Sequence, residues 1–270
     1  MLFSPCHLMA LLRHLVLFLA LLATSSTSFA AATLVAVASN FSTPAREIAA
    51  VFAEKTGHRA MISSSSSGKL YAQIAQGAPF DLFLSADKAH AEKLLAAGKA
   101  VAGSNFTYAI GQLALYSKEP HLVDANGEIL KNTERINKVA IANPKLAPYG
   151  LAAIETMKQL GVYESLNSKL VLGENIAQTF QFVYSGNAEV GFVALSQLKA
   201  LKPVSERTEG AWWIVPEHLY TPIAQDAVLL RHGENNTAAM AFLEFLTSPA
   251  AVEIIHHYGY ITSEDASTDR

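Results

Sequence analysis

The chain has 270 residues, with 20 Lys and Arg against 23 Asp and Glu and a formal net charge of −3. A mildly acidic protein has no long-range attraction for nucleic acid or acidic membranes, so neither is an expected partner. The only cysteine is Cys6, which excludes an internal disulfide.

The first 30 residues differ in composition from the rest of the chain. Arg13 and His14 precede an apolar run at 15–23, and a polar stretch of small residues follows. This order is typical of a cleaved secretory signal peptide, and the apolar run is shorter than the ~20 residues that span a bilayer. We expect residues 1–30 to be removed together with Cys6. The mature chain then has 19 basic and 23 acidic residues, a net charge of −4, and is expected in the periplasm.

Apolar strand-like runs alternate with amphipathic helical patterns along the remaining chain. The first part predicts, in chain order, a strand at 34–38, a helix at 44–55 that stops at Gly57, a strand at 58–62, a helix at 68–76, a strand at 81–84 and a helix at 87–97. The pattern restarts with a strand run at 110–116, a strand at 139–142, a helix at 151–160, a strand at 170–172, a helix at 176–184, and strands at 190–193 and 227–230. Helices at 237–246 and 249–256 follow, and the polar residues 263–270 are expected to fray.

This alternation predicts an α/β protein with mixed, mostly parallel sheets and helices on both faces. The apolar runs at 110–116 and 224–230 are candidates for chain crossings between two units of usual domain size. We predict a first lobe formed by residues 31–112, a second lobe formed by 113–224, and a return to the first lobe over 225–270. A ligand in such an architecture lies in the cleft between the lobes, at the carboxyl ends of strands.

Four segments share one design, in which a strand end or tight turn with small or hydroxyl-bearing residues leads into a helix. They are 39–42, 65–68, 147–150 and 173–176. The first turn of a helix has unpaired N–H groups and the positive end of the helix dipole. Several such turns in one cleft could hold a dianion without a cationic side chain, and the hydroxyls of Ser39 and Ser67 could add donors. Ordinary helix capping explains each segment taken singly, and the serine run 63–67 is equally compatible with a flexible polar loop.

The most specific blocks are the serine-rich stretch 64–70 and the stretch 77–87, which reads Gly-Ala-Pro-Phe-Asp-Leu-Phe-Leu-Ser-Ala-Asp. With these blocks, and with further matches at 35–39, 142–150, 187–191 and 258–259, the whole mature chain resembles the molybdate-binding periplasmic proteins of ABC importers. The resemblance implies a two-lobed periplasmic-binding-protein fold of type II with a hinged cleft. It implies a monomer that is not an enzyme, has no cofactor, and delivers its oxyanion to a permease in the inner membrane.

The resemblance also implies the ligand-binding residues. Ser39 and Ser67 hold the anion from the first lobe, and the main chain near Tyr149 and at Ile176 holds it from the second. Asn40 adds an amide, as in the branch of the family that has a polar residue at this position. Molybdenum is then bound as molybdate through these same residues, with no side chain coordinating a metal cation directly.

The sequence departs from part of the family at Ala194, where some members place a tyrosine hydroxyl on the anion. Molybdate and tungstate are nearly equal in size, so we expect poor discrimination between them and exclusion of sulfate by cavity size. A site for sulfate or phosphate is an alternative, and phosphate would need Asp81 or Glu174 as an acceptor for its proton. An exported hydrolase with a serine nucleophile at Ser39 or Ser67 is a further alternative, but neither serine lies in a recognisable motif.

Other motifs have ordinary structural explanations. Asp87 is expected to cap the helix that follows it. Trp212 and Trp213 are expected to pack in a core or between lobes rather than to stack on a ligand.

Overall fold

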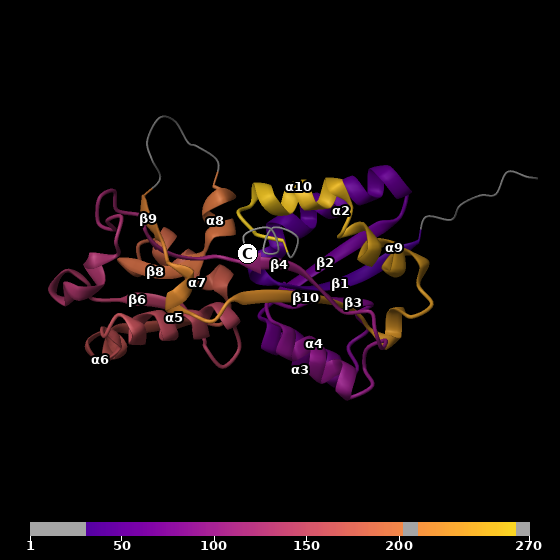
Figure 1. Cartoon of the computed structure of the whole chain (residues 1–270), viewed down its shortest axis with the longest axis horizontal. Coiled ribbons are helices and arrows are strands. Elements are labelled where there is room, and N and C mark those ends of the chain that lie inside the picture. Colours follow the sequence, from indigo (N-terminus) through magenta and orange to yellow (C-terminus); the bar gives the residue numbers. More distant parts are fainter. Residues whose placement is uncertain (1–30, 202–209, 263–270) are drawn as a thin grey trace, which may run out of the picture. The chain divides into compact units, whose positions relative to one another are not determined.

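The computed structural model describes residues 31–201 and 210–262. The predicted signal peptide, residues 1–30, and the predicted frayed end, 263–270, lie outside the described residues. The described part of the chain forms two five-stranded sheets, each covered by helices on both faces (Figure 1). The structure is therefore two-lobed, as predicted.

The first sheet has the strand order β2-β1-β3-β10-β4. Its strands are β1 (Ala32–Ala38), β2 (Arg59–Ser65), β3 (Leu82–Leu84), β4 (Phe106–Gly111) and β10 (Ile223–Leu229). β1 pairs in parallel with β2 and β3, whereas β10 runs antiparallel to β3 and β4. Four of the five strands therefore share one direction, and the strand that returns from the second lobe is the reversed one.

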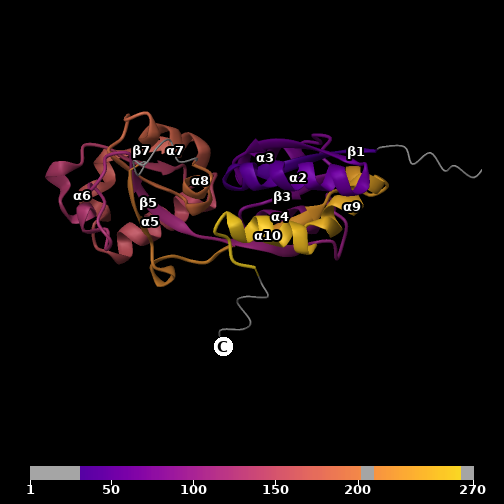
Figure 2. The same cartoon turned by 90° about the horizontal axis from the view of Figure 1, so that it is seen from above.

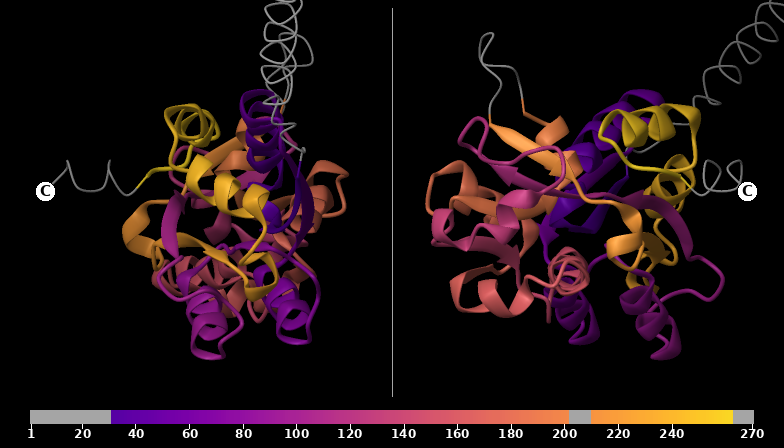
Figure 3. Two further views of the ribbon diagram at one scale, coloured as in Figure 1. Left: turned by 90° about the vertical axis from the view of Figure 1, so that its right-hand side faces the viewer. Right: turned by 60° about the vertical axis from the view of Figure 1, so that its left-hand side comes forward.

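Helices cover both faces of this sheet because successive side chains of a strand point to opposite faces. Val35 and Val37 pack under α2 (Ser42–Thr56), α9 (Thr237–Phe245) and α10 (Pro249–His257), with α10 against α2 (Figures 1 and 2). Ala36, between them, packs under α3 (Ser67–Ala75) and α4 (Lys88–Ala96), which lie together on the other face (Figure 3).

The second sheet has the order β7-β6-β8-β5-β9. Its strands are β5 (Leu113–Ser117), β6 (Val139–Ala142), β7 (Leu170–Gly173), β8 (Val190–Ala194) and β9 (Ala211–Ile214). β6 pairs in parallel with β7 and β8, and β5 runs antiparallel to β8 and β9. One face packs against α5 (Pro148–Gln159) and α6 (Tyr163–Leu166), and the other packs against α7 (Ile176–Tyr184) and α8 (Leu195–Lys199). The two lobes thus repeat one topology.

Short 3₁₀ helices connect these elements. They are η1 (Ser39–Phe41), η2 (Glu128–Lys131), η3 (Thr133–Arg135), η4 (Asn167–Lys169), η5 (Glu217–Leu219) and η6 (Arg231–Gly233). Within the described ranges, no single helix is long and apolar enough to cross a membrane; α9 and α10 meet that criterion only as a pair, bent by 60°.

The strand run predicted at 110–116 is in fact two strands. β4 ends at Gly111 in the first sheet, and β5 begins at Leu113 in the second, so the chain crosses between the lobes at Gln112. It returns through the segment between β9 and β10, and Figure 2 shows both connections. The run 110–116 therefore contains the first crossing, whereas the run 224–230 lies in and just after β10 and follows the second.

Two further predictions have clear outcomes. The serine run is not a flexible loop: Ser63 to Ser65 form the end of β2, and Ser66 caps α3, because the β pairing with β1 continues to Ser65. Trp213 is buried in the core of the second lobe, as predicted for a packing residue, whereas the side chain of Trp212 on β9 is exposed. The apolar patterns predict neither the short strand β9 nor α8.

Candidate functional site

The four segments singled out in the sequence lie at the carboxyl ends of parallel strands. In the first lobe η1 follows β1 and α3 follows β2, and the two strand ends are paired through Ala38 and Ser65. In the second lobe the turn before α5 follows β6 and α7 follows β7, paired through Ala142 and Gly173. The carboxyl ends of neighbouring parallel strands meet at one edge of a sheet, so each lobe presents two of the segments together.

Three hydrogen bonds bring these two edges into contact across the lobes. The main-chain N–H of Gly68 donates to the carbonyl oxygen of Leu146 at 2.9 Å. The ammonium of Lys69 lies 2.7 Å from the carboxylate of Glu174. On the other side, the Ser196 hydroxyl donates to the main-chain oxygen of Asn40 at 2.9 Å. The segments around the five predicted site residues therefore face each other in the described structure.

Ser39 and Ser67 place hydroxyls on the first-lobe side. Ser67 is the first residue of α3, and only 1% of it is exposed. Its oxygen accepts a hydrogen bond from the N–H of Ala86 at 2.9 Å, so its own hydrogen remains available to a ligand. Ser39 is partly exposed at the start of η1, and its hydroxyl makes no hydrogen bond to any residue that the structure describes.

Tyr149 and Ile176 supply main-chain donors on the second-lobe side. Tyr149 is the second residue of α5 and Ile176 the first residue of α7, so their N–H groups precede the first bonds within each helix. Both residues are buried, with 1% and 2% exposed. A buried N–H without a partner inside the helix needs an acceptor, which a bound anion would provide.

Asn40 is placed differently from the other four residues. Its amide nitrogen donates to Gln225 Oε1 at 2.7 Å and to Tyr260 Oη at 3.0 Å, and the residue is 3% exposed. Both amide hydrogens are therefore used inside the protein. The main-chain N–H of Asn40, in the first turn of η1, is the group left for a ligand.

Gln225 is the centre of this buried network, and sequence patterns did not reveal it. It lies on β10 with no exposed surface, accepts from Tyr108 Oη at 3.1 Å, and donates towards Tyr149 Oη at 3.4 Å. It thus connects the η1 segment of the first lobe to α5 of the second. Gln225 and Asn40 are 185 residues apart, which leaves no local motif to find.

The tyrosines of this network are neutral donors or acceptors at ordinary pH. Burial raises the pKa of Tyr108 and of Tyr149 well above the usual value. Burial also raises the pKa of Tyr260 to about 12, although its side-chain hydrogen bonds with Ser196 and Asn40 oppose this effect. Lys69, the cation beside the α3 start, is paired with a carboxylate. Across the described residues, no Lys or Arg side chain is hydrogen-bonded to any of the five predicted site residues.

The two acidic side chains considered as proton acceptors for phosphate, Asp81 and Glu174, have partners within the protein. The carboxylate of Asp81 accepts from the N–H of Leu34, near the start of β1, at 2.8 Å, and from His232 at 2.7 Å. This places Asp81 near the amino end of β1, opposite the strand end that leads to Ser39. Glu174 is exposed and forms an ion pair with Lys69. Each of these carboxylates is therefore paired with a side chain of the protein, Asp81 with His232 and Glu174 with Lys69.

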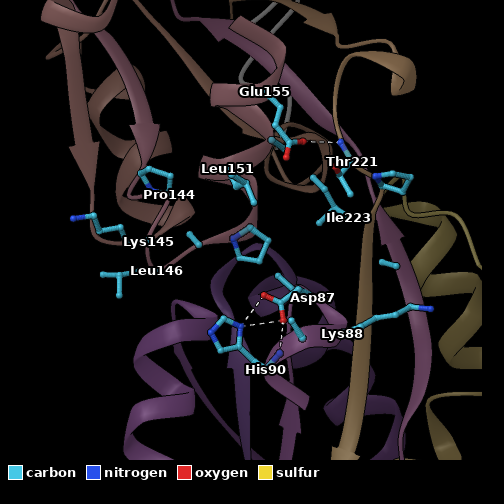
Figure 4. Close-up of a pocket in the computed structure, with 17 residues that line it drawn as sticks. Asp87, Lys88, His90, Pro144, Lys145, Leu146, Leu151, Glu155, Thr221 and Ile223 are labelled. Carbon is cyan, nitrogen blue, oxygen red and sulfur yellow. Dashed lines mark hydrogen bonds and ion pairs between the residues drawn. The ribbon is translucent and has the colours of Figure 1, made fainter. Parts of the chain in front are cut away.

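A separate pocket of about 410 Å³ lies between the start of α4, α5 and β10 (Figure 4). None of the five predicted site residues lines it. Asp87 caps α4 through the N–H of His90, as predicted, and its carboxylate also lies 2.7 Å from the His90 ring. Burial would raise the pKa of Asp87, but the hydrogen bonds from His90 and Ser85 outweigh it and the pKa is lowered. The pocket lining carries acidic side chains, Asp87 and Glu155, together with the basic side chains of Lys88 and Lys145.

The two serines are also not arranged as nucleophiles. Within the described ranges the Ser67 hydroxyl accepts from the N–H of Ala86, and neither serine is hydrogen-bonded to a histidine or an acid. A serine nucleophile needs such a base to take its proton.

A two-lobed α/β structure with donors converging from both lobes defines a class of ligand-binding proteins. The chain belongs to the bacterial extracellular solute-binding proteins, whose family model matches residues 33–261. It is 53% identical to the molybdate-binding protein ModA of Rhodobacter capsulatus, over 84% of this chain and 87% of that protein. It is 49% identical to ModA of Azotobacter vinelandii, over 84% of this chain and 88% of that protein. Among solved structures, it is similar to the periplasmic molybdate-binding protein of Azotobacter vinelandii, with a TM-score of 0.79 and 39% identity over 84% of this chain and 98% of the other.

Proposed function

We propose that the protein captures molybdate in the periplasm and delivers it to the permease of an ABC importer. The observation that carries this proposal is that helix starts of both lobes and the serine hydroxyls lie at facing edges of the two sheets. In the described residues, no Lys or Arg side chain is hydrogen-bonded to the predicted site residues. The similarity to molybdate-binding proteins, at 53% and 49% identity, supports the choice of ligand.

The anion accepts hydrogen bonds from the hydroxyls of Ser39 and Ser67 and from the main-chain N–H groups of Asn40, Tyr149 and Ile176. Hydrogen bonds to a charged acceptor are about twice as strong as neutral ones. Enclosure between the lobes excludes water and strengthens each of them. The protein holds molybdenum only as the oxyanion and needs no further cofactor.

Discrimination of molybdate from other oxyanions follows from the size of the anion and from the kind of donors that surround it. Sulfate has the same kind of acceptor oxygens but is smaller, so it reaches the donors of both lobes less well. Tungstate is nearly the same size as molybdate and binds with similar affinity. Phosphate is disfavoured because Asp81 is held at the far end of β1 and Glu174 is paired with Lys69, leaving no acceptor for its proton.

The remaining expectations are part of the same proposal. Residues 1–30 are a cleaved signal peptide, and the mature protein is a monomer that catalyses no reaction and binds no nucleic acid. The proposed lobe boundaries, 112/113 and 224/225, lie at the first crossing and just after the second, and the lobes close on the anion about these crossings. Mass spectrometry and light scattering of the exported protein test the cleavage site and the monomer.

Isothermal titration calorimetry of the mature protein tests the ligand. We expect sub-micromolar binding of molybdate and tungstate and feeble binding of sulfate under the same conditions. Tighter binding of sulfate than of molybdate would reject molybdate as the ligand. Phosphate binding that depends on the protonation state of the anion would favour the phosphate alternative instead.

A further inference from the structure

Three consecutive residues at the start of α3 all lie at the junction of the lobes. Ser67 carries a hydroxyl of the proposed site. Gly68 donates its N–H to Leu146 at 2.9 Å, and Lys69 pairs with Glu174 at 2.7 Å. We propose that Gly68 is a positioning residue that sets how closely the lobes approach each other, and so the spacing of the donors around the anion. This inference rests on the proposed function.

The contact at Gly68 cannot be adjusted by side-chain rotation, because main-chain atoms form both of its sides. A Cβ atom at Gly68 would lie 3.1 Å from the Cα and from the carbonyl oxygen of Leu146. Such a distance is too short for an undisturbed contact, so any side chain here would keep the lobes apart by a few tenths of an ångström. Only glycine allows the approach that the structure shows.

The backbone conformation gives no other reason for glycine at this position. Gly68 is not among the residues with positive φ, and it lies in the first turn of a regular helix. Glycine is less favourable than alanine in a helix. An alanine would therefore fit α3 itself, and its only unfavourable contact would be with the opposite lobe.

The position of the contact connects it directly to the anion. Gly68 directly follows Ser67. Leu146 directly precedes Ala147, the cap of α5, and so lies three residues before Tyr149. A separation imposed at this point lengthens the hydrogen bonds between the anion and one of the two lobes. Hydrogen bonds weaken steeply outside a narrow distance range, and tetrahedral oxyanions differ in size by only a fraction of an ångström.

The neighbouring ion pair between Lys69 and Glu174 is exposed and flexible, unlike the main-chain contact at Gly68. The side chains of Lys69 and Glu174 are 39% and 65% exposed, and both are long and flexible. An exposed pair of this kind contributes little and is screened by salt. It can follow a small change in lobe separation, whereas the main-chain contact at Gly68 cannot. Lys69→Met is therefore a matched control in the same turn of α3.

The test compares wild-type protein, Gly68→Ala and Lys69→Met as full mature chains. Radioactive molybdate is bound to each protein and chased with excess unlabelled tungstate, and association is measured separately by rapid filtration. For Gly68→Ala we expect release to be faster by about tenfold, a change of about 1.4 kcal/mol, with association within about twofold of wild type because the contact exists only when the lobes are together. Lys69→Met should release molybdate within about twofold of the wild-type rate.

Two further readouts separate this role from a structural defect. The melting temperature of ligand-free Gly68→Ala should be equal to or above that of wild type, because alanine favours the helix. Calorimetry should show molybdate and tungstate weakened by the same factor, because they have nearly the same size. If Gly68→Ala misfolds, Gly68→Ser serves as the second variant with the same expectations.

The outcomes are distinguishable. A wild-type protein that binds no molybdate would overturn the proposed function and, with it, this inference. If wild type binds molybdate but Gly68→Ala releases it at the wild-type rate, the proposed function stands and the role of Gly68 is wrong. Equal acceleration in Gly68→Ala and Lys69→Met would also overturn it, because any loss of interlobe contact would then suffice.

Discussion

Replacement of Ser67 by alanine removes a hydroxyl with two roles in this structure. As a donor to a charged ligand it contributes about 1.5–3 kcal/mol, so its loss should raise the Kd for molybdate about 10- to 150-fold. As an acceptor it satisfies the N–H of Ala86 at 2.9 Å, and Ala86 is 2% exposed. Leaving that buried N–H without a partner should lower the free energy of unfolding by about 1–3 kcal/mol.

The adjacent Ser66 provides a matched control. It is also buried, and its hydroxyl accepts from the N–H of Lys69 at 3.4 Å as the cap of α3. Ser66→Ala should lower the free energy of unfolding by about 0.5–2 kcal/mol, the usual effect of losing a cap. It removes no donor from the proposed site, so its affinity for molybdate should change by less than about twofold.

Calorimetry with molybdate, together with urea unfolding of the ligand-free proteins, measures both effects. Both variants should be less stable than wild type, and only Ser67→Ala should bind molybdate weakly. Wild-type affinity in Ser67→Ala would show that its hydroxyl does not contact the anion. Equal losses of affinity in the two variants would attribute the effect to the start of α3 as a whole.

Two further predictions concern the buried network between the lobes. Gln225→Leu keeps the approximate volume but leaves the Asn40 amide without its 2.7 Å partner, so the free energy of unfolding measured in urea should fall by about 1–3 kcal/mol; an unchanged value would show that the amide finds another partner. The pKa of Tyr260 is raised to about 12 from 10.0, so its burial contributes stability that is fully present below pH 10 and is lost as the pH rises towards 12. Unfolding free energies measured across that range should fall in wild type and fall less in Tyr260→Phe, and identical profiles would contradict the assignment.

Local sequence chemistry predicted the elements with strong boundary signals. The helix expected to stop at Gly57 does so, because that residue adopts the left-handed conformation at φ 72°. The strand at 139–142 and the helix at 176–184 have the predicted bounds, and Asp87 caps α4 as expected. In each case the decisive interactions lie within a few residues of one another.

Features that depend on contacts between residues far apart in the sequence could not be predicted from local patterns. The apolar run at 110–116 has the pattern of one strand, and only the pairing of its halves with different sheets shows that it is divided at Gln112. The helix starts that carry Ser67 and Ile176 could be recognised locally, although their role in anion binding stays a prediction. The engagement of the Asn40 amide by Gln225 depends on a partner in another element and could not be foreseen.

The central claim is that neutral hydroxyl and amide donors of both lobes hold the anion. A crystal structure of the molybdate complex, with the metal located by its anomalous scattering, tests this claim most directly. We predict molybdenum between η1, α3, α5 and α7, with its oxygens within hydrogen-bond distance of Ser39, Ser67 and the main chain at Tyr149 and Ile176, and no Lys or Arg in contact. Molybdenum held by a lysine or arginine, or found in the pocket beside Asp87, would contradict it.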